Sequence, residues 1–204
     1  MVQKLRNRNP GQVAMTTQMS SITPMQVRKL VQDFQRSDER VLVLPFDGSH
    51  EDVSKHWHQF LKLSPWELLK KSVVLALTRC LYSGRLKNAL LRSIGVKVGK
   101  NVFIASMVQL DIQFPELITI DDGAILGMHS HLATHEVTHS HIRLGKVHIG
   151  KNALIGGQAT VRSGVTVGDN AVVAMRAFVT QDVAPQTLVT GVPDRKVVEL
   201  EAAV

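Results

Sequence analysis

The feature that most limits the fold of this chain is an aliphatic residue at every sixth position of its C-terminal half. A helix places apolar residues about 3.6 positions apart and a half-buried strand places them two apart, so a period of six fits neither over such a length. Short strands that turn a corner every six residues do fit. The series consists of Ile149, Ile155, Val161, Val167, Val173 and Val179.

A second series accompanies the first, four residues later in each repeat: Ala153, Ala159, Val165, Ala171, Ala177 and Val183. The same pattern occurs upstream, at Val98, Ile104 and Leu110, with Val102, Val108 and Phe114 four residues later, and again at Ile120, Leu126 and Leu132. The triplets GKN at 99–101, GKN at 150–152 and GDN at 168–170 occupy equivalent corners. Glycine and asparagine suit such corners because they adopt positive φ at low cost.

Three six-residue repeats make one coil, of about 18 residues, of a triangular prism whose coils bury their aliphatic side chains against one another. The regular spacing is lost once in the downstream half, between about 136 and 146. We therefore expect an excursion loop that leaves the prism at residues 136–146.

These repeats and the tail VTQDVAPQTLVTGVPDRKV at 179–197 resemble the hexapeptide-repeat acyltransferases of the maltose, galactoside and nodulation-factor acetyltransferase type. The resemblance covers roughly residues 94–198. It implies a mainly β fold, the left-handed parallel β-helix, assembled as a homotrimer. The left-handed sense rests on the resemblance alone, since most parallel crossovers are right-handed.

Four regions follow from these patterns. We expect a disordered polar tail at 1–22, a mainly helical region at 23–93, the β-helix at 94–198 and a C-terminal tail at 199–204. Within the second region, Thr23-Pro24 predicts the start of a short helix, because proline is favoured at the first helical position. The run VLVLPF at 41–46 predicts a strand.

A stronger helical pattern begins at Ser64-Pro65 and has an apolar stripe with basic residues around it. Two interpretations of 64–95 stay open: it packs over the open end of the prism, or it lies as a basic amphipathic helix on an anionic membrane surface. We expect the lone cysteine, Cys80, to be a small buried apolar residue. The stripe consists of Trp66, Leu69, Val73, Leu77, Cys80 and Leu81.

Charge divides the chain into two unlike halves. Residues 1–97 hold 16 Lys and Arg against 7 Asp and Glu, whereas residues 98–204 hold 8 against 10. A single cysteine suits a reducing cytosol, and no apolar signal core follows the basic N-terminus, so we expect a cytoplasmic protein, at the inner face of the membrane if 64–95 binds lipid. Few aromatic residues and no recognition motif argue against nucleic acid.

The stretch HEVTH at 135–139 matches the zinc-protease pattern H-E-x-x-H. That pattern requires a continuous helix, whereas the upstream repeats predict a strand and a corner here, and Val137 and Thr138 do not favour a helix. The resemblance instead implies that His135 is a general base. Imidazole suits this role because its ordinary pKa of about 6.5 lets it take a proton near neutral pH. It also implies an acceptor side at Asp111, His129 and His131, although Asp111 could equally cap a corner. Glu136 is one carboxylate that could orient the imidazole.

The resemblance further implies acetyl-CoA as the acyl donor, held in a groove between neighbouring prisms. The matching positions are Gly157, Met175, Thr180, Gln181 and Arg195. Met175 and Gln181 depart from the family pattern, which has a small residue and a lysine there.

The function we expect is acyl transfer, preferentially O-acetylation, to a hydroxyl or amine of a saccharide-like acceptor, with no metal required. Two alternatives stay open: a zinc-dependent carbonic-anhydrase-like enzyme on the same fold, and a non-catalytic trimeric scaffold. The first lacks an upstream ligand, because no histidine lies between His58 and His129.

Overall fold

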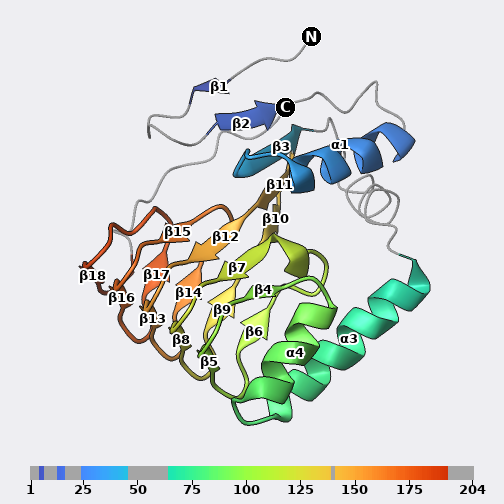
Figure 1. Ribbon diagram of the computed structural model, residues 1–204. Helices are drawn as coiled ribbons and strands as arrows, with labels where there is room; N and C mark the ends of the chain where they lie inside the picture. Colours follow the sequence, from blue (N-terminus) through green and yellow to red (C-terminus); the bar gives the residue numbers. More distant parts are fainter. Residues whose placement is uncertain (1–4, 7–12, 17–23, 46–63, 139–140, 193–204) are drawn as a thin grey trace.

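A computed structural model of the chain describes residues 5–6, 13–16, 24–45, 64–138 and 141–192. Three parallel sheets form a prism, two helices cover the prism end at which its first coil lies, and a small sheet with one helix lies beside another edge (Figure 1). The predicted mainly β architecture is thus confirmed, and the three-sheet arrangement is that of a parallel β-helix. Its left-handed sense and its assembly as a trimer stay predictions.

Each sheet of the prism takes one strand from each successive coil. The first sheet contains β4 (Lys97–Val98), β7 (Ile118–Ile120), β12 (Val147–Ile149) and β15 (Thr166–Val167). The second contains β5 (Phe103–Ile104), β8 (Ile125–Leu126), β13 (Leu154–Ile155), β16 (Val172–Val173) and β18 (Leu188–Val189). The third contains β6 (Gln109–Leu110), β9 (His131–Leu132), β14 (Thr160–Val161) and β17 (Phe178–Val179).

The strand register stacks the six-residue series directly upon itself. Leu126, Ile155 and Val173 are paired in the second sheet, and Leu132, Val161 and Val179 in the third. Nearly all members of both series are completely buried, and they form one continuous hydrophobic core. The predicted prism is confirmed residue by residue from Ile149 to Val183, because each step of six reaches the next sheet and three steps stack one aliphatic side chain on another, as Val167 on Ile149.

The corners of the prism also follow the sequence. Asn101, Asn152 and Asn170 end the three predicted triplets, and each has a positive φ between 53° and 56°. The glycines of the coils serve a different purpose, which is close approach between coils. A Cβ at Gly156 would lie 2.5 Å from the backbone nitrogen of Met175 in the next coil.

Gly156→Ala is therefore expected to destabilise the protein by about 1–3 kcal/mol, since two coils would have to move apart to admit the methyl group. The matched control is Gly84→Ala, which precedes α4 in extended backbone and has no atom within 4 Å of the added Cβ. Urea denaturation measures both. A loss of stability in the control equal to that in Gly156→Ala would contradict the explanation.

Two insertions leave the prism at the same edge, between the third sheet and the first. The shorter contains Asp111 and the 3₁₀ turn Pro115–Leu117, and it is visible in the sequence as a spacing of ten positions, in place of six, from Leu110 to Ile120. Phe114, expected as a repeat position, belongs to this insertion and to a separate core, because the extra residues carry it out of the prism. The longer insertion is the predicted excursion, and it forms an antiparallel hairpin of β10 (His135–Val137) and β11 (His141–Gly145).

This hairpin is extended by the N-terminal region. The predicted strand at 41–46 is β3 (Val41–Pro45), which pairs antiparallel with β11. The predicted short helix is α1 (Pro24–Arg36), whose Val27 and Phe34 pack with Leu42, Leu144 and other residues in a second hydrophobic core. The Nζ of Lys146 donates to the carbonyl of Ser37 and lies over the ring of Phe34.

The segment expected to be a disordered tail, 1–22, differs in part from that expectation. It contains β1 (Leu5–Arg6) and β2 (Val13–Thr16), and β2 pairs parallel with β3. This pairing orders the strand, and its partner lies too far along the chain for local composition to reveal it. The remainder of 1–22 and the tail at 199–204 lie outside the described residues.

The strong helical pattern forms two helices, α3 (Pro65–Cys80) and α4 (Arg85–Ser93), with Gly84 as the N-cap of the second. They cover the prism end that carries β4, and Asn88 and Arg92 donate to the carbonyl groups of Val102 and Val98 in the first coil. The interpretation that 64–95 packs over the open end thus fits this arrangement.

The face of α3 that meets the protein is not the predicted stripe. Val74, Leu75 and Thr78 are buried, whereas the stripe from Trp66 to Cys80 is exposed. Cys80 is therefore a surface residue, contrary to expectation, because the turn of α3 that meets the prism is set by tertiary contacts. We call Trp66, Leu69, Val73 and Leu77 the outer face of α3.

Candidate active site

The two insertions at one edge of the prism bring a carboxylate and a histidine together. His135 begins β10, and its Nδ1 lies 2.5 Å from Oδ2 of Asp111, which follows β6 one coil earlier. The carboxylate is almost completely buried and also accepts the backbone N–H groups of Gln113 and Thr134, at 2.9 and 3.1 Å. The Asp111 side chain is thus fixed by several donors, and it in turn fixes the imidazole ring.

Asp111, which the resemblance places on the acceptor side, contacts His135 in this arrangement, and its contact with an acceptor stays a prediction. Burial alone would raise the pKa of Asp111, but the hydrogen bond and positive charge of His135, with the bonds from Thr134 and Gln113, lower that pKa to about 2. The carboxylate is therefore ionised at neutral pH. Since it can only accept, the Nδ1 of His135 is the donor, and the lone pair of the neutral ring lies on Nε2.

Two further rings surround the pair. Phe114 meets the His135 imidazole edge-on, with ring centroids 6.1 Å apart. His131 lies in β9, the strand before β10, and is near enough to Asp111, His135 and Arg79 to respond to their charges. Burial and the two positive neighbours lower the pKa of His131 against the pull of Asp111, which favours a neutral imidazole there. The sequence predicted Phe114 as a repeat position and not as a site residue, although the widened spacing that contains it was visible.

Glu136, the other carboxylate considered for orienting the histidine, belongs to a different cluster. Its carboxylate accepts from Nη2 of Arg162 at 2.7 Å, from Nη1 of Arg143 at 2.9 Å and from Oγ of Ser163 at 2.5 Å. Burial would raise the pKa of Glu136, but the bonds from Arg162 and Ser163 and the charge of Arg143 lower it. Glu136 therefore connects the hairpin to the next coil, and Asp111 is the carboxylate that orients His135.

Glu136→Gln is expected to destabilise the protein by about 1–3 kcal/mol, because Arg143 and Arg162 would lose a shared anionic acceptor. It is also expected to lower kcat by loosening the strand that begins at His135. Urea denaturation and initial rates measure the two effects. Glu67→Gln, an exposed carboxylate on α3, is the control. Unchanged stability in Glu136→Gln would show that the cluster does not hold the hairpin.

A surface groove follows the next edge of the prism, between the second and third sheets. It brings together the predicted acceptor residue His129 and the predicted coenzyme residues Gly157 and Met175. Three residues of this groove have positive φ although none is glycine or asparagine: His129, Gln158 and Arg176, at 60° to 61°. Such backbone costs about 1–2 kcal/mol per residue and is often found where function requires it.

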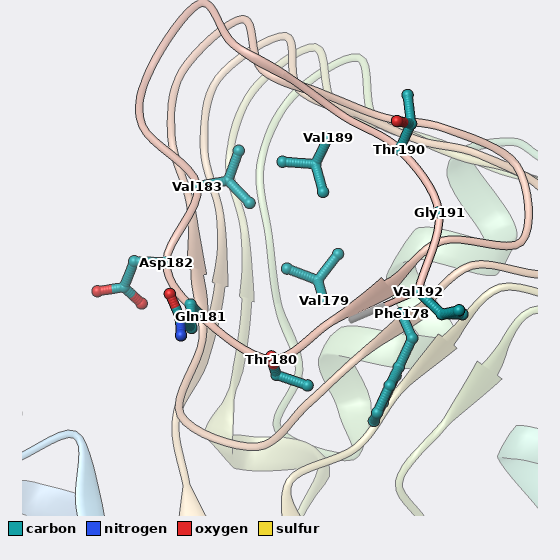
Figure 2. A pocket seen from close by; sticks show the side chains of 10 residues that line it. All are labelled: Phe178, Val179, Thr180, Gln181, Asp182, Val183, Val189, Thr190, Gly191 and Val192. Atoms are coloured by element: carbon teal, nitrogen blue, oxygen red, sulfur yellow. The ribbon is translucent and has the colours of Figure 1, made fainter. Parts of the chain in front are cut away.

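The other predicted coenzyme residues lie elsewhere. Thr180 and Gln181 line a pocket at the last coil, where Val179, Val183 and Val189 point into the interior of the prism and Asp182 points away from it (Figure 2). Within the described residues, therefore, no single groove of one chain holds all four. Arg195 lies outside the described residues.

Comparisons with known proteins agree with this geometry. The family described as the hexapeptide repeat of succinyl-transferase matches residues 146–181. A Bacillus subtilis protein named as an acetyltransferase, YvoF, is 35% identical over 140 residues, which cover 68% of this chain and 81% of the relative. The chain belongs to the hexapeptide-repeat acetyltransferases. The resemblance read from the sequence and the prediction of an acetyltransferase are both confirmed.

Two more comparisons concern galactoside acetyltransferases. The galactoside O-acetyltransferase of Escherichia coli is 30% identical over 112 residues, which cover 52% of this chain and 54% of the relative. A solved galactoside acetyltransferase in complex with coenzyme A has a TM-score of 0.53 and 20% identity, and the match covers 83% of this chain and 90% of the other. At that identity, the second likeness shows the fold.

In this hexapeptide-repeat acetyltransferase, the described residues contain no group of three or more His, Cys, Asp or Glu side chains placed to bind a metal ion. Among these described residues, His129, His131 and His135 therefore do not form a metal-binding group. None of the helices in the described part of the chain is long and apolar enough to cross a membrane.

Proposed function

We propose that this hexapeptide-repeat acetyltransferase moves an acetyl group from acetyl-CoA to a hydroxyl or amine of a sugar-like acceptor, with His135 as general base. The observation that carries the proposal is the bond of 2.5 Å between Nδ1 of His135 and the buried carboxylate of Asp111. It gives the imidazole one orientation and one tautomer, which is what a general base in a defined site needs.

In the proposed reaction, Nε2 of His135 removes the proton from the acceptor hydroxyl or amine as that atom attacks the thioester carbonyl. The ionised Asp111 stabilises the imidazolium that results. The tetrahedral intermediate then collapses, the carbon–sulfur bond breaks, and the imidazolium returns its proton to the leaving thiolate. The products are the acetylated acceptor and free coenzyme A, and His135 ends neutral.

The donor and the acceptor are supported unequally. Acetyl-CoA as donor is confirmed at the level of the family, in which a solved acetyltransferase holds coenzyme A, the product of the transfer. The saccharide-like acceptor is inferred from the relative named for its action on galactosides. Within the site, His131 is the residue best placed to contact the acceptor, because it lies near enough to His135 to respond to its charge.

A homotrimer is part of the proposal. The groove with Gly157 and Met175 follows one edge of the prism, whereas His135 leaves from the next edge, across the third sheet. Closed rotational packing of three prisms would set the groove of one subunit against the hairpin of its neighbour. The donor would then meet Gly157 and Met175 on one subunit and Thr180 and Gln181 on another. Sedimentation analysis of the purified protein tests this, and a monomer at assay concentrations would contradict it.

The test of the reaction is acetyl-CoA turnover with a panel of hydroxyl and amino sugars. Release of coenzyme A is followed with a thiol reagent, and mass spectrometry shows whether an ester or an amide forms. We expect release to accelerate with at least one sugar and to yield an acetylated product. Release at the same slow rate with and without every acceptor, and no acetylated product, would overturn the sugar proposal.

A further inference from the structure

The outer face of α3 is an exposed apolar surface. Trp66 is 78% exposed, Leu69 52%, Val73 48% and Leu77 53%. Their spacing of three and four positions places them on one side of the helix, opposite Val74, Leu75 and Thr78, which pack on the protein. Apolar surfaces of this kind on a folded protein mark interaction sites.

Two further exposed side chains follow α3 in the chain. Tyr82 is 78% exposed and Leu86, on α4, is 65% exposed. An aromatic side chain with a polar group thus lies near each end of the apolar stretch, Trp66 at one and Tyr82 at the other. Tryptophan and tyrosine are the residues that favour the boundary between lipid and water, because their rings are apolar and each carries one polar group.

The charge around this surface is strongly positive. Residues 64–95 contain six Lys and Arg and a single acidic residue, Glu67, although Lys87 is buried and Lys71 pairs with Glu116. Lys70, Arg79, Arg85 and Arg92 are all exposed. Anionic lipid headgroups attract such clusters, with the attraction confined to about a Debye length from the surface.

We propose that the outer face of α3 docks on a bilayer surface that contains anionic lipids. The apolar side chains would enter the boundary region while the basic side chains meet the headgroups. A second copy of the chain is a less suitable occupant, since two such faces would bring like charges together. The dock would also place lipid near the candidate acceptor residue, because Arg79 at the end of α3 lies within electrostatic reach of His131.

The test uses the full chain and vesicles of phosphatidylcholine, alone or mixed with phosphatidylglycerol. We expect the protein to float with the mixed vesicles and to release as salt is raised. The double variant Leu69→Gln, Leu77→Gln keeps good helix formers at both positions. Its affinity for the mixed vesicles is expected to fall by at least about tenfold. Leu188→Gln, which alters an equally exposed leucine at the other end of the prism, is expected to bind as the unaltered protein does.

Three outcomes would overturn the membrane proposal. The first is no flotation with either vesicle, and the second is an equal loss of vesicle binding in Leu188→Gln. The third is an altered sedimentation mass in the double variant, which would assign the outer face of α3 to contact between copies of the chain. Acetyl transfer to a soluble sugar is measured alongside and is expected to be unchanged in the double variant. Failure of the membrane proposal is thereby distinguished from failure of the proposed reaction.

Discussion

His135→Ala is expected to lower kcat for acetyl transfer by about 10²–10⁴-fold, because no other group would take the acceptor proton during attack on the thioester. The KM for acetyl-CoA is expected to change little, since His135 is not among the proposed donor contacts. Thermal stability is also expected to persist, because Asp111 keeps the backbone N–H groups of Gln113, Phe114 and Thr134 as partners.

The structure offers a matched control for this variant. His148 makes a second histidine–aspartate pair with Asp121, at 2.8 Å, on the first sheet of the prism. His148→Ala should leave kcat unchanged. Added imidazole is expected to restore part of the rate to His135→Ala and none to an otherwise impaired variant. Retention of more than about a tenth of kcat in His135→Ala would exclude a general base at this position.

Asp111→Asn is expected to lower kcat by about 10²-fold or more, through the wrong tautomer of His135. An amide nitrogen facing Nδ1 would require that atom to accept, which transfers the ring proton to Nε2, the atom proposed to act as base. The KM for both substrates should change less than kcat, because Asp111 is buried and acts through His135. Initial rates measure this, with Asp121→Asn as the control, and normal kcat in Asp111→Asn would remove the positioning role.

The stability difference between the unaltered protein and Asp111→Asn is expected to depend on pH. The folded-state pKa of Asp111, about 2, is below its ordinary value of 3.8. The carboxylate therefore stabilises the folded state above about pH 4, and this contribution is lost as the pH falls through 2. Urea denaturation should show the unaltered protein more stable than Asp111→Asn at pH 7, with the difference shrinking between pH 4 and pH 2. A difference in the free energy of unfolding that does not change with pH would show that the charge of Asp111 does not stabilise the folded state.

The prism could be predicted from the sequence because each coil depends only on its neighbours. The spacing of Ile149, Ile155 and Val161 is a local signal, and the same contacts between neighbouring coils recur along the prism. The outer face of α3 could not be oriented in this way, because an apolar stripe tells which side of a helix is apolar and not which side meets the rest of the protein. The buried side of α3 was decided by where α4 and the first coil lie.

The sequence predicted which residues belong to the candidate site better than it predicted which of them contact one another. His135 is where a histidine at the start of the excursion should be. Its pairing with Asp111 depended on two insertions, in consecutive coils, that leave from one edge, and the first appeared in the sequence only as a gap between Leu110 and Ile120. The partners of Glu136 come from β11 and from the next coil, so the residues near Glu136 in the sequence could not predict them.

The pairing of β3 with β11 joins residues about 100 positions apart, such as Leu42 and Leu144, whereas neighbouring coils join residues much closer along the chain. As the polypeptide leaves the ribosome, the N-terminal strand must wait for nearly three-quarters of the chain before its partner emerges. Assembly of the coils can advance one layer at a time, but the hairpin at His135 is completed only by a long-range closure. The enzyme is thus expected to acquire its shape before it acquires a rigid catalytic loop.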